Sequence, residues 1–191
     1  MTRRYALAFG AFVLVMALVG ALLFAIAPRW SRSSQARAAA APAPAAPATP
    51  GRKIKARLFY MADDGARLTG VEREVAYGEG AAEQARQILE AQIAPVSEPL
   101  VSAIPPATKV RAVFLTDRAE AFVDFNSELT TGHTGGSTDE ILTVYAIVNA
   151  LTSNLPAVKS VQILVNGKQM ETLAGHVDLR RPLAQNLAWV Q

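Results

Sequence analysis

The chain has no cysteine among its 191 residues. Without thiols it cannot form a disulfide, a thiolate metal site or a cysteine nucleophile, and it lacks the lipidated cysteine that anchors bacterial lipoproteins. Histidine is almost as scarce, because only His133 and His176 are present. Any histidine-based metal or nucleophilic site would have to use one of these two residues.

A basic surface for nucleic acid is also lacking, although the chain carries a net charge of +3. Of the 19 Lys and Arg residues, five arginines lie in residues 1–51, which contain no acidic residue. The rest of the chain is slightly acidic, with 16 Asp and Glu against the remaining 14 basic residues. Because phosphate-backbone binding depends on a concentrated positive surface, we expect no nucleic-acid partner.

The usual catalytic motifs are missing as well. The sequence contains no G-x-S-x-G elbow, no H-E-x-x-H and no dinucleotide-binding glycine pattern. We therefore expect no enzyme and no cofactor. A hydrolase built on two carboxylates is left open, because such acids can lie far apart in sequence, and its first candidates are Glu72, Glu74 and Asp124.

One long apolar run is present near the N-terminus. Residues 5–27 contain no charged side chain, and as a helix they would span about 34 Å, enough to cross the hydrocarbon core of a bilayer. We expect residues 1–27 to be a retained transmembrane anchor in contact with lipid. A cleaved signal peptide is the alternative, because Ala25-Ile26-Ala27 resembles a cleavage site, but Pro28 argues against cleavage.

The orientation of this anchor does not follow from charge, because Arg29, Arg32 and Arg37 outnumber Arg3 and Arg4. Residues 28–51 are rich in alanine and proline, with little that could be buried. We expect this segment to be a linker and residues 52–191 to form one domain.

The first part of this domain predicts a hairpin and a helix. An apolar strand around residues 56–61, a turn at Asp63-Asp64-Gly65 and an alternating stretch over 68–77 form the hairpin. Apolar residues then recur at helical spacing over 81–93, and Pro95 ends that helix.

Two further strands and a second helix come next. Residues 109–115 and 120–125 are typical of strands. Ser137 and Glu140 have the Ser-x-x-Glu spacing of a capping box, which predicts a helix start at Ser137. We expect Pro156 to close this helix, whose core stripe consists of Ile141, Val144, Tyr145, Val148 and Leu151.

The chain ends with a second hairpin. Residues 161–165 form an apolar strand, Asn166-Gly167 supplies the positive φ angles of a tight turn, and the return strand covers about 168–173. The order is therefore ββαββαββ. This predicts an α+β fold with two helices packed on one face of a mostly antiparallel sheet.

The glycine-rich loop before the second helix is the first candidate site. Free amides and the helix dipole gather around His133, Gly135, Gly136 and Ser137 and could hold an anion. No P-loop lysine follows, and Asp139 with Glu140 would repel a phosphate. Helix capping is the preferred interpretation.

The segment Gly175-His176-Val177-Asp178 is the second candidate. Two potential ligands are too few for a zinc site, so we expect no metal. The preferred interpretation is structural: Gly175 makes a turn, His176 and Asp178 bond nearby backbone, and Asp178 caps or braces the next few residues of the chain.

Several segments resemble the GerMN domain, a family of sporulation and germination domains, and match it in order over nearly all of residues 52–191. The matching segments are ARLFYMADDGARLTGVEREV, LVSAIPPATKV, FVDFNSEL, GGSTDEILTVYAIVNALTSNLPAVKSVQILVNGK and LAGHVDLRRPL.

The resemblance implies a domain outside the cytoplasmic membrane of a bacterium, in a family that takes part in cell-envelope assembly and is similar in fold to ring-building modules. It implies a structural role for residues 175–178 and no catalytic one. The namesake of the family is a lipoprotein with two such domains, whereas this chain has an apolar anchor, no cysteine and a single copy. A sporulation role is therefore not expected to carry over.

Our leading hypothesis is a single-pass, non-enzymatic envelope protein whose C-terminal domain assembles with itself or with other envelope proteins. The first alternative is a peptidoglycan-binding module that uses polar residues of the loop over 130–137. An envelope hydrolase ranks last.

Overall fold

The computed structural model describes residues 51–191. The expected anchor at 5–27 and the linker before Gly51 lie outside these residues. Within the part of the chain that is described, no helix is both long and apolar enough to span a bilayer.

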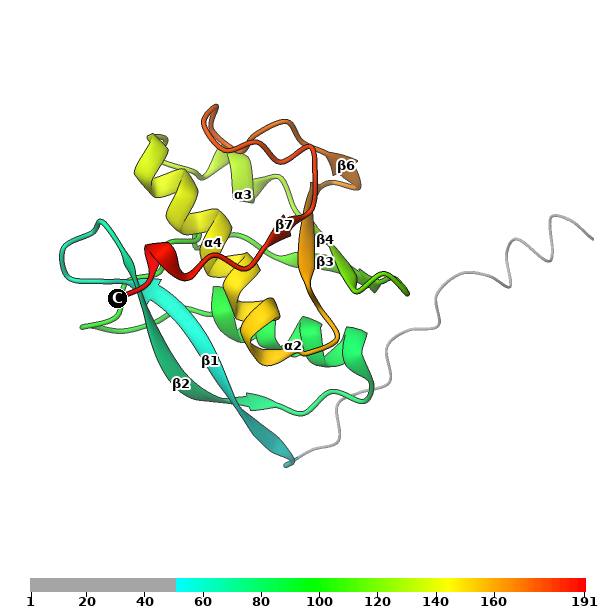
Figure 1. Ribbon diagram of the computed structural model, residues 1–191. Coiled ribbons are helices and arrows are strands. Elements are labelled where there is room, and N and C mark those ends of the chain that lie inside the picture. The colour runs from blue at the N-terminus through cyan, green and yellow to red at the C-terminus, as the bar shows by residue number, and fades with distance from the viewer. Residues whose placement is uncertain (1–50) are drawn as a thin grey trace, which may run out of the picture. The chain divides into compact units, whose positions relative to one another are not determined.

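The domain contains seven strands, three α-helices and one short 3-10 helix in its described part (Figure 1). In chain order they are β1 (Lys53–Met61), β2 (Leu68–Ala76), α2 (Ala81–Ile93), β3 (Val110–Leu115), β4 (Glu120–Phe125), α3 (Glu128–Thr131), α4 (Ser137–Asn154), β5 (Ser160–Val165), β6 (Lys168–Gln169), β7 (Leu183–Ala184) and η1 (Leu187–Trp189). The two long helices and the six main strands confirm the predicted order.

Strands β1 and β2 form a separate two-stranded antiparallel sheet. Their pairing runs without a break from Lys53 opposite Ala76 to Met61 opposite Leu68. The predicted turn between them is confirmed, with Gly65 at φ 65° and its N–H donated to the carbonyl of Ala62.

Side-chain amides close the other edge of β1. The N–H and C=O of Phe59 bond Oε1 and Nε2 of Gln92, at 2.8 and 2.7 Å. The N–H and C=O of Arg57 bond Oδ1 and Nδ2 of Asn154, both at 2.8 Å. Gln92 comes from α2 and Asn154 from α4, so each helix supplies one amide that takes the place of a neighbouring strand.

The second sheet has five strands, in the order β3-β4-β5-β6 with β7 also paired to β5. Strands β3 and β4 are antiparallel, but β4 and β5 are parallel. The expectation of one mostly antiparallel sheet is therefore corrected to two sheets, with a parallel pair at the centre of the larger one. The physical reason is that α4 connects β4 to β5 as a crossover, which returns the chain in the same direction.

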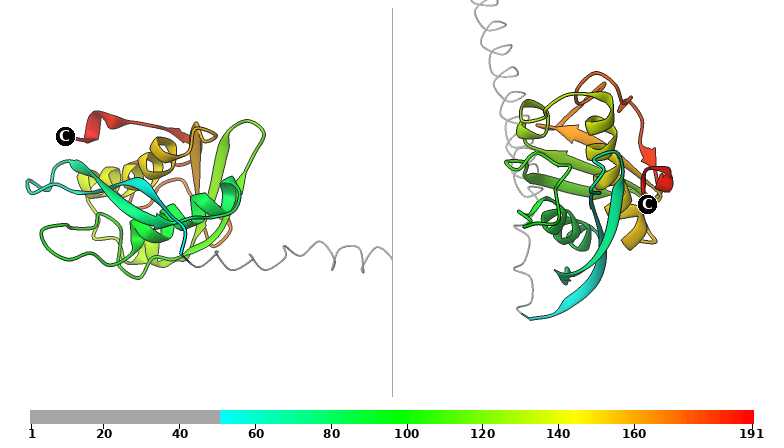
Figure 2. Two further views of the ribbon diagram at one scale, coloured as in Figure 1. Left: turned by 90° about the horizontal axis from the view of Figure 1, so that it is seen from below. Right: turned by 90° about the vertical axis from the view of Figure 1, so that its left-hand side faces the viewer.

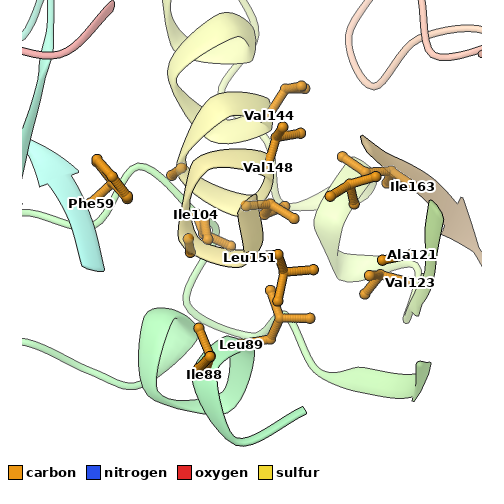
Figure 3. Packing of buried hydrophobic residues seen from close by; sticks show 14 of the residues in the cluster. Phe59, Ile88, Leu89, Ile104, Ala121, Val123, Val144, Val148, Leu151 and Ile163 are labelled. Atoms are coloured by element: carbon orange, nitrogen blue, oxygen red, sulfur yellow. The ribbon is translucent and has the colours of Figure 1, made fainter. Parts of the chain in front are cut away.

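Helices α2 and α4 lie between the hairpin formed by β1 and β2 and the five-stranded sheet (Figures 1 and 2). Figure 3 shows Phe59 of β1 on one side of α4 and Ile163 of β5 on the other. Helix α4 is consequently buried on most of its surface, including Leu142, Ala146 and Ile147 outside the predicted stripe. Val144, Val148 and Leu151 of the predicted stripe are buried, but Ile141 and Tyr145 are only partly buried. The buried surface is wider than predicted because α4 packs against two layers instead of one.

The turn between β5 and β6 is as predicted, with Asn166 at φ 51° and Gly167 at φ 74°. The return strand is shorter than expected and ends at Gln169. The N–H of Leu173, which the sequence places in this strand, instead donates to the carboxylate of Glu140 on α4. This contact draws the chain away from β5.

Candidate functional site

The most distinctive surface of the domain is the free edge of β3. Among the described strands, β3 pairs only with β4. The N–H of Thr116 donates to the carbonyl of Glu120 at 3.0 Å, and Ala119 at φ 61° completes the turn. Strand alternation then directs the backbone groups of Phe114 toward β4, and those of Val113 and Leu115 away from it.

Apart from Arg111, the side chains of β3 are apolar; Val110, Val113 and Leu115 are partly buried against the core, whereas Phe114 is exposed. No residue of the strand is fully buried, and Phe114 is 56% exposed. Phe114 lies opposite the partly exposed Phe122 of β4, which in turn lies beside Gln162 of β5. The two rings therefore share the sheet face opposite the buried Val123 and Ile163.

The other long strand edges carry features that oppose pairing. The amides of Gln92 and Asn154 occupy the edge of β1. Strand β2 presents Glu72, Arg73 and Glu74, which are all exposed, and charge is a common protection of sheet edges. Arg86 of α2 covers the start of β3, at 3.5 Å from the carbonyl of Val110 and 3.3 Å from that of Arg111.

Within residues 51–191, nothing comparable covers the end of β3. In Figure 1 the β3–β4 hairpin extends to the right beyond the end of α2. We define the free edge at Val113–Leu115 together with Phe122 as the β3 surface. It is the candidate protein-binding surface of the described domain.

The predicted glycine-rich loop borders a pocket of about 270 Å³. His133 and Thr134 line it, and Asp139 is its one charged lining residue. The remaining lining residues are Met61, Ser102, Ala103, Ile104, Pro105, Pro106, Gly132 and Thr143. Gly135, Gly136 and Ser137 do not line the pocket.

His133 is fixed by a chain of hydrogen bonds. Its Nδ1 accepts the N–H of Gly135 at 2.9 Å, so its Nε2 carries the proton and donates to Oγ1 of Thr143 at 3.2 Å. Thr143 donates in turn to the carbonyl of Ala103 at 2.5 Å. This chain ties the loop and α4 to the segment around Ala103, and Gly135 allows it through its φ of 87°.

The predicted capping box is wrong. Gly136, at φ 93°, is the N-cap of α4, and no side chain caps the helix. Glu140 is fully buried and accepts the N–H of Leu173 at 2.8 Å, the N–H of His176 at 2.8 Å and Nδ1 of His176 at 3.1 Å. The carboxylate turns away from Ser137 because these amides of the C-terminal segment need an acceptor.

Burial by itself would raise the pKa of Glu140. The backbone N–H groups of Ala174, His176, Leu173 and Val177 outweigh burial and hold this pKa below its usual value. Glu140 is therefore a structural anion in a nest of amides.

The second candidate segment is also structural in its contacts. Gly175 adopts a φ of 101°, as a turn requires. Asp178 accepts the N–H of Arg180 at 2.9 Å and pairs with its guanidinium, which lowers the pKa of Asp178 to about 2. His176 bonds the Glu140 carboxylate and not nearby backbone, so that part of the expectation is corrected.

Asn166 and Gly167 also have contacts within the fold. Oδ1 of Asn166 accepts from Arg111 at 3.3 Å, and the N–H of Gly167 donates to Asp124 at 2.7 Å. Of the predicted site residues, His133 lines the pocket, His176 bonds Glu140, and Asn166 and Gly167 form this turn. Gly135, Gly136 and Ser137 lie in the loop outside the pocket lining, and Asp178 pairs with Arg180.

The three carboxylates suggested for a hydrolase do not lie together at one site. Glu72 and Glu74 lie on β2 and form ion pairs with Lys55 and Lys53, at 3.8 and 2.9 Å respectively. Asp124 belongs to the other sheet and pairs with Arg111 at 3.2 Å.

The β3 surface was not among the residues singled out from the sequence. Both faces of β3 and β4 carry apolar residues. The sequence pattern therefore does not show that the face with Phe114 and Phe122 is the uncovered one. The missing signal was the position of β3 at the end of the sheet.

Solved structures with a similar fold include the following two. A Clostridium perfringens protein described as a lipoprotein matches with a TM-score of 0.50 and 21% identity, over 69% of this chain and 87% of that chain. The tandem GerMN domains of the sporulation protein GerM from Bacillus subtilis match with a TM-score of 0.52 and 17% identity, over 71% of this chain and 46% of that chain. No curated protein matches.

The sequence itself matches the Germane family, described as sporulation and spore germination, over residues 57–171. This match covers more than half of the chain and extends from β1 to the segment after β6. It agrees with the resemblance noted from the sequence segments. The chain therefore belongs to the Germane family of sporulation and spore germination domains.

Proposed function

We propose that this protein is a membrane-anchored, non-enzymatic protein of the bacterial cell envelope that assembles with itself or with other envelope proteins through the β3 surface. Residues 5–27 hold it in the cytoplasmic membrane, and the domain at 52–191 acts outside. The apolar anchor sequence and the family support this location.

The observation that carries the proposal is the exposed Phe114 on an unpaired strand edge. An edge strand offers backbone donors and acceptors to an extended segment of a partner, while side chains beside it supply specificity. Aromatic side chains are also enriched in protein interfaces.

The test compares Phe114→Lys with Val101→Lys in the full chain, extracted from its native envelope in mild detergent. Val101 is a matched control because it is 52% exposed and lies outside the β3 surface. We expect the wild type and Val101→Lys to migrate as assemblies with their protein partners, and Phe114→Lys to migrate alone. Assemblies of equal size in all three proteins would contradict the proposal.

The pocket favours a second candidate, peptidoglycan binding. The loop proposed to contact the cell wall borders a cavity whose walls combine apolar residues with Ser102, His133, Thr134 and Thr143, and which carries one carboxylate, Asp139. Such a cavity fits a stem peptide that carries small apolar side chains and an amino group.

Co-sedimentation of the protein with purified peptidoglycan tests this candidate. Thr134→Trp narrows the pocket, whereas Thr138→Trp changes an exposed residue outside its lining. Saturable binding that only Thr134→Trp weakens would favour the wall-binding function. A wild type that stays in the supernatant would reject it.

A further inference from the structure

We propose that the occupant of the β3 surface is a second copy of this chain, paired antiparallel through β3 with Phe114 of one copy opposite Phe114 of the other. The inference rests on the proposed function and names its partner. This pairing would join the five-stranded sheets of the two copies edge to edge.

The backbone of β3 fits this register. The outward N–H and C=O groups belong to Val113 and Leu115. With Phe114 at the centre, Val113 of each copy meets Leu115 of the other, and both residues exchange their N–H and C=O groups. The carbonyls covered by Arg86, those of Val110 and Arg111, are not needed.

The side chains fit the same register. Phe114 meets its counterpart in a pair without direct backbone hydrogen bonds, where side chains approach most closely and aromatic pairs are favourable. Each Phe114 lies opposite Phe122 of its own chain. The two sheets would thus join their aromatic residues into one covered stripe.

Charge is complementary across this interface. The register places Arg111 of each copy, whose guanidinium also contacts Asp124 and Asn166 of its own chain, opposite Asp117 of the other, and both residues are exposed. No two residues of like charge face one another between Arg111 and Asp117, because the residues between them are uncharged. A partner of unrelated sequence has no such built-in match.

The paired segment is short, so association should be weak in dilute solution. An anchor confines the chains to a membrane and raises their effective concentration. The test therefore uses the full chain in membrane vesicles. The absence of cysteine makes each introduced thiol unique.

Oxidation of Phe114→Cys should give a covalent dimer, because residues opposite one another without direct hydrogen bonds lie within disulfide distance. Phe122→Cys, on the adjacent strand, is the matched control and should remain monomeric. Ala112→Cys and Thr116→Cys keep Phe114 in place. Neither should cross-link alone, but a mixture of the two should give the heterodimer.

Failure of both the Phe114→Cys dimer and the mixed heterodimer would overturn the self-pairing. Equal cross-linking by Phe122→Cys would overturn the register. If the cysteine variants fail while Phe114→Lys still removes assemblies with other proteins, self-pairing is wrong and the proposed function stands. If wild type forms no assembly of any kind, both are wrong.

Discussion

At the scale of single residues, Glu140 holds the C-terminal segment against α4. Its buried carboxylate accepts the N–H groups of Leu173 and His176. Glu140→Gln keeps the shape of the side chain but replaces one carboxylate oxygen by an NH2 group. This group cannot accept a hydrogen bond from the N–H groups of Leu173 or His176. We expect a loss of about 2 kcal/mol in the free energy of unfolding, measured by urea denaturation.

Asp139→Asn is the control for this change. Asp139 precedes Glu140 on α4 but is only partly buried, and its contact is a hydrogen bond from the exposed Thr134. We expect a change within about 0.5 kcal/mol. Equal effects of the two variants would show that the amide nest does not stabilise the domain.

The same carboxylate predicts a pH dependence. Because the folded pKa of Glu140 is lowered, its stabilising contribution is fully present above its unfolded pKa of about 4.3 and is lost as pH falls through the folded pKa. The difference in urea midpoint between wild type and Glu140→Gln should be largest at pH 7 and shrink below about pH 4. A difference that stays constant down to pH 3 would contradict this assignment.

Sequence alone could not assign this role to Glu140. Ser137 and Glu140 have the spacing of a capping box, but that motif acts between neighbours on one helix. The amides that compete for the carboxylate lie at Leu173 and His176, more than thirty positions away along the chain. These amides bind the carboxylate in place of the capping-box contact with Ser137.

At the scale of elements, two side-chain amides occupy the edge of β1 that faces away from β2. Replacing Gln92 by Leu leaves the N–H and C=O of the buried Phe59 without partners, at a cost of about 3 kcal/mol. Asn154→Leu should cost less, about 1 kcal/mol, because Arg57 is exposed and water can replace the amide. Chemical denaturation of both variants measures the difference.

Gln87→Leu provides the control on α2, because Gln87 bonds only the nearby Glu83. We expect little change in stability. If Asn154→Leu were as costly as Gln92→Leu, burial of the strand edge would not be the deciding factor.

The elements themselves could be predicted because their signals are local. The Asn166-Gly167 turn, the Asp63-Asp64-Gly65 turn and the apolar spacing of the long helices each lie within a few residues. The division into two sheets depends on contacts such as Gln92 with Phe59, which no local pattern contains. The short elements α3, β7 and η1 have no period long enough to detect.

At the scale of the whole molecule, α4 is the element that both sheets share. Figure 3 shows Val144 and Val148 of α4 on the side of Ile163, with Phe59 across the helix. All four side chains are buried in one hydrophobic core. The hairpin and the five-stranded sheet should therefore unfold together and not as separate units.

Phe59→Ala tests this coupling. Loss of a buried aromatic side chain from the hairpin should lower the free energy of unfolding by about 3–5 kcal/mol. Far-UV circular dichroism follows the secondary structure of both sheets. Fluorescence of Trp189, measured in a Trp30→Phe background, follows the hairpin of β1 and β2, because the next residue, Val190, forms a bridge to Leu68 of β2. We expect both signals to shift to the same lower urea midpoint. If the fluorescence transition moved while circular dichroism kept a second transition at the original midpoint, the hairpin would be an independent unit, and α4 would not couple the two layers.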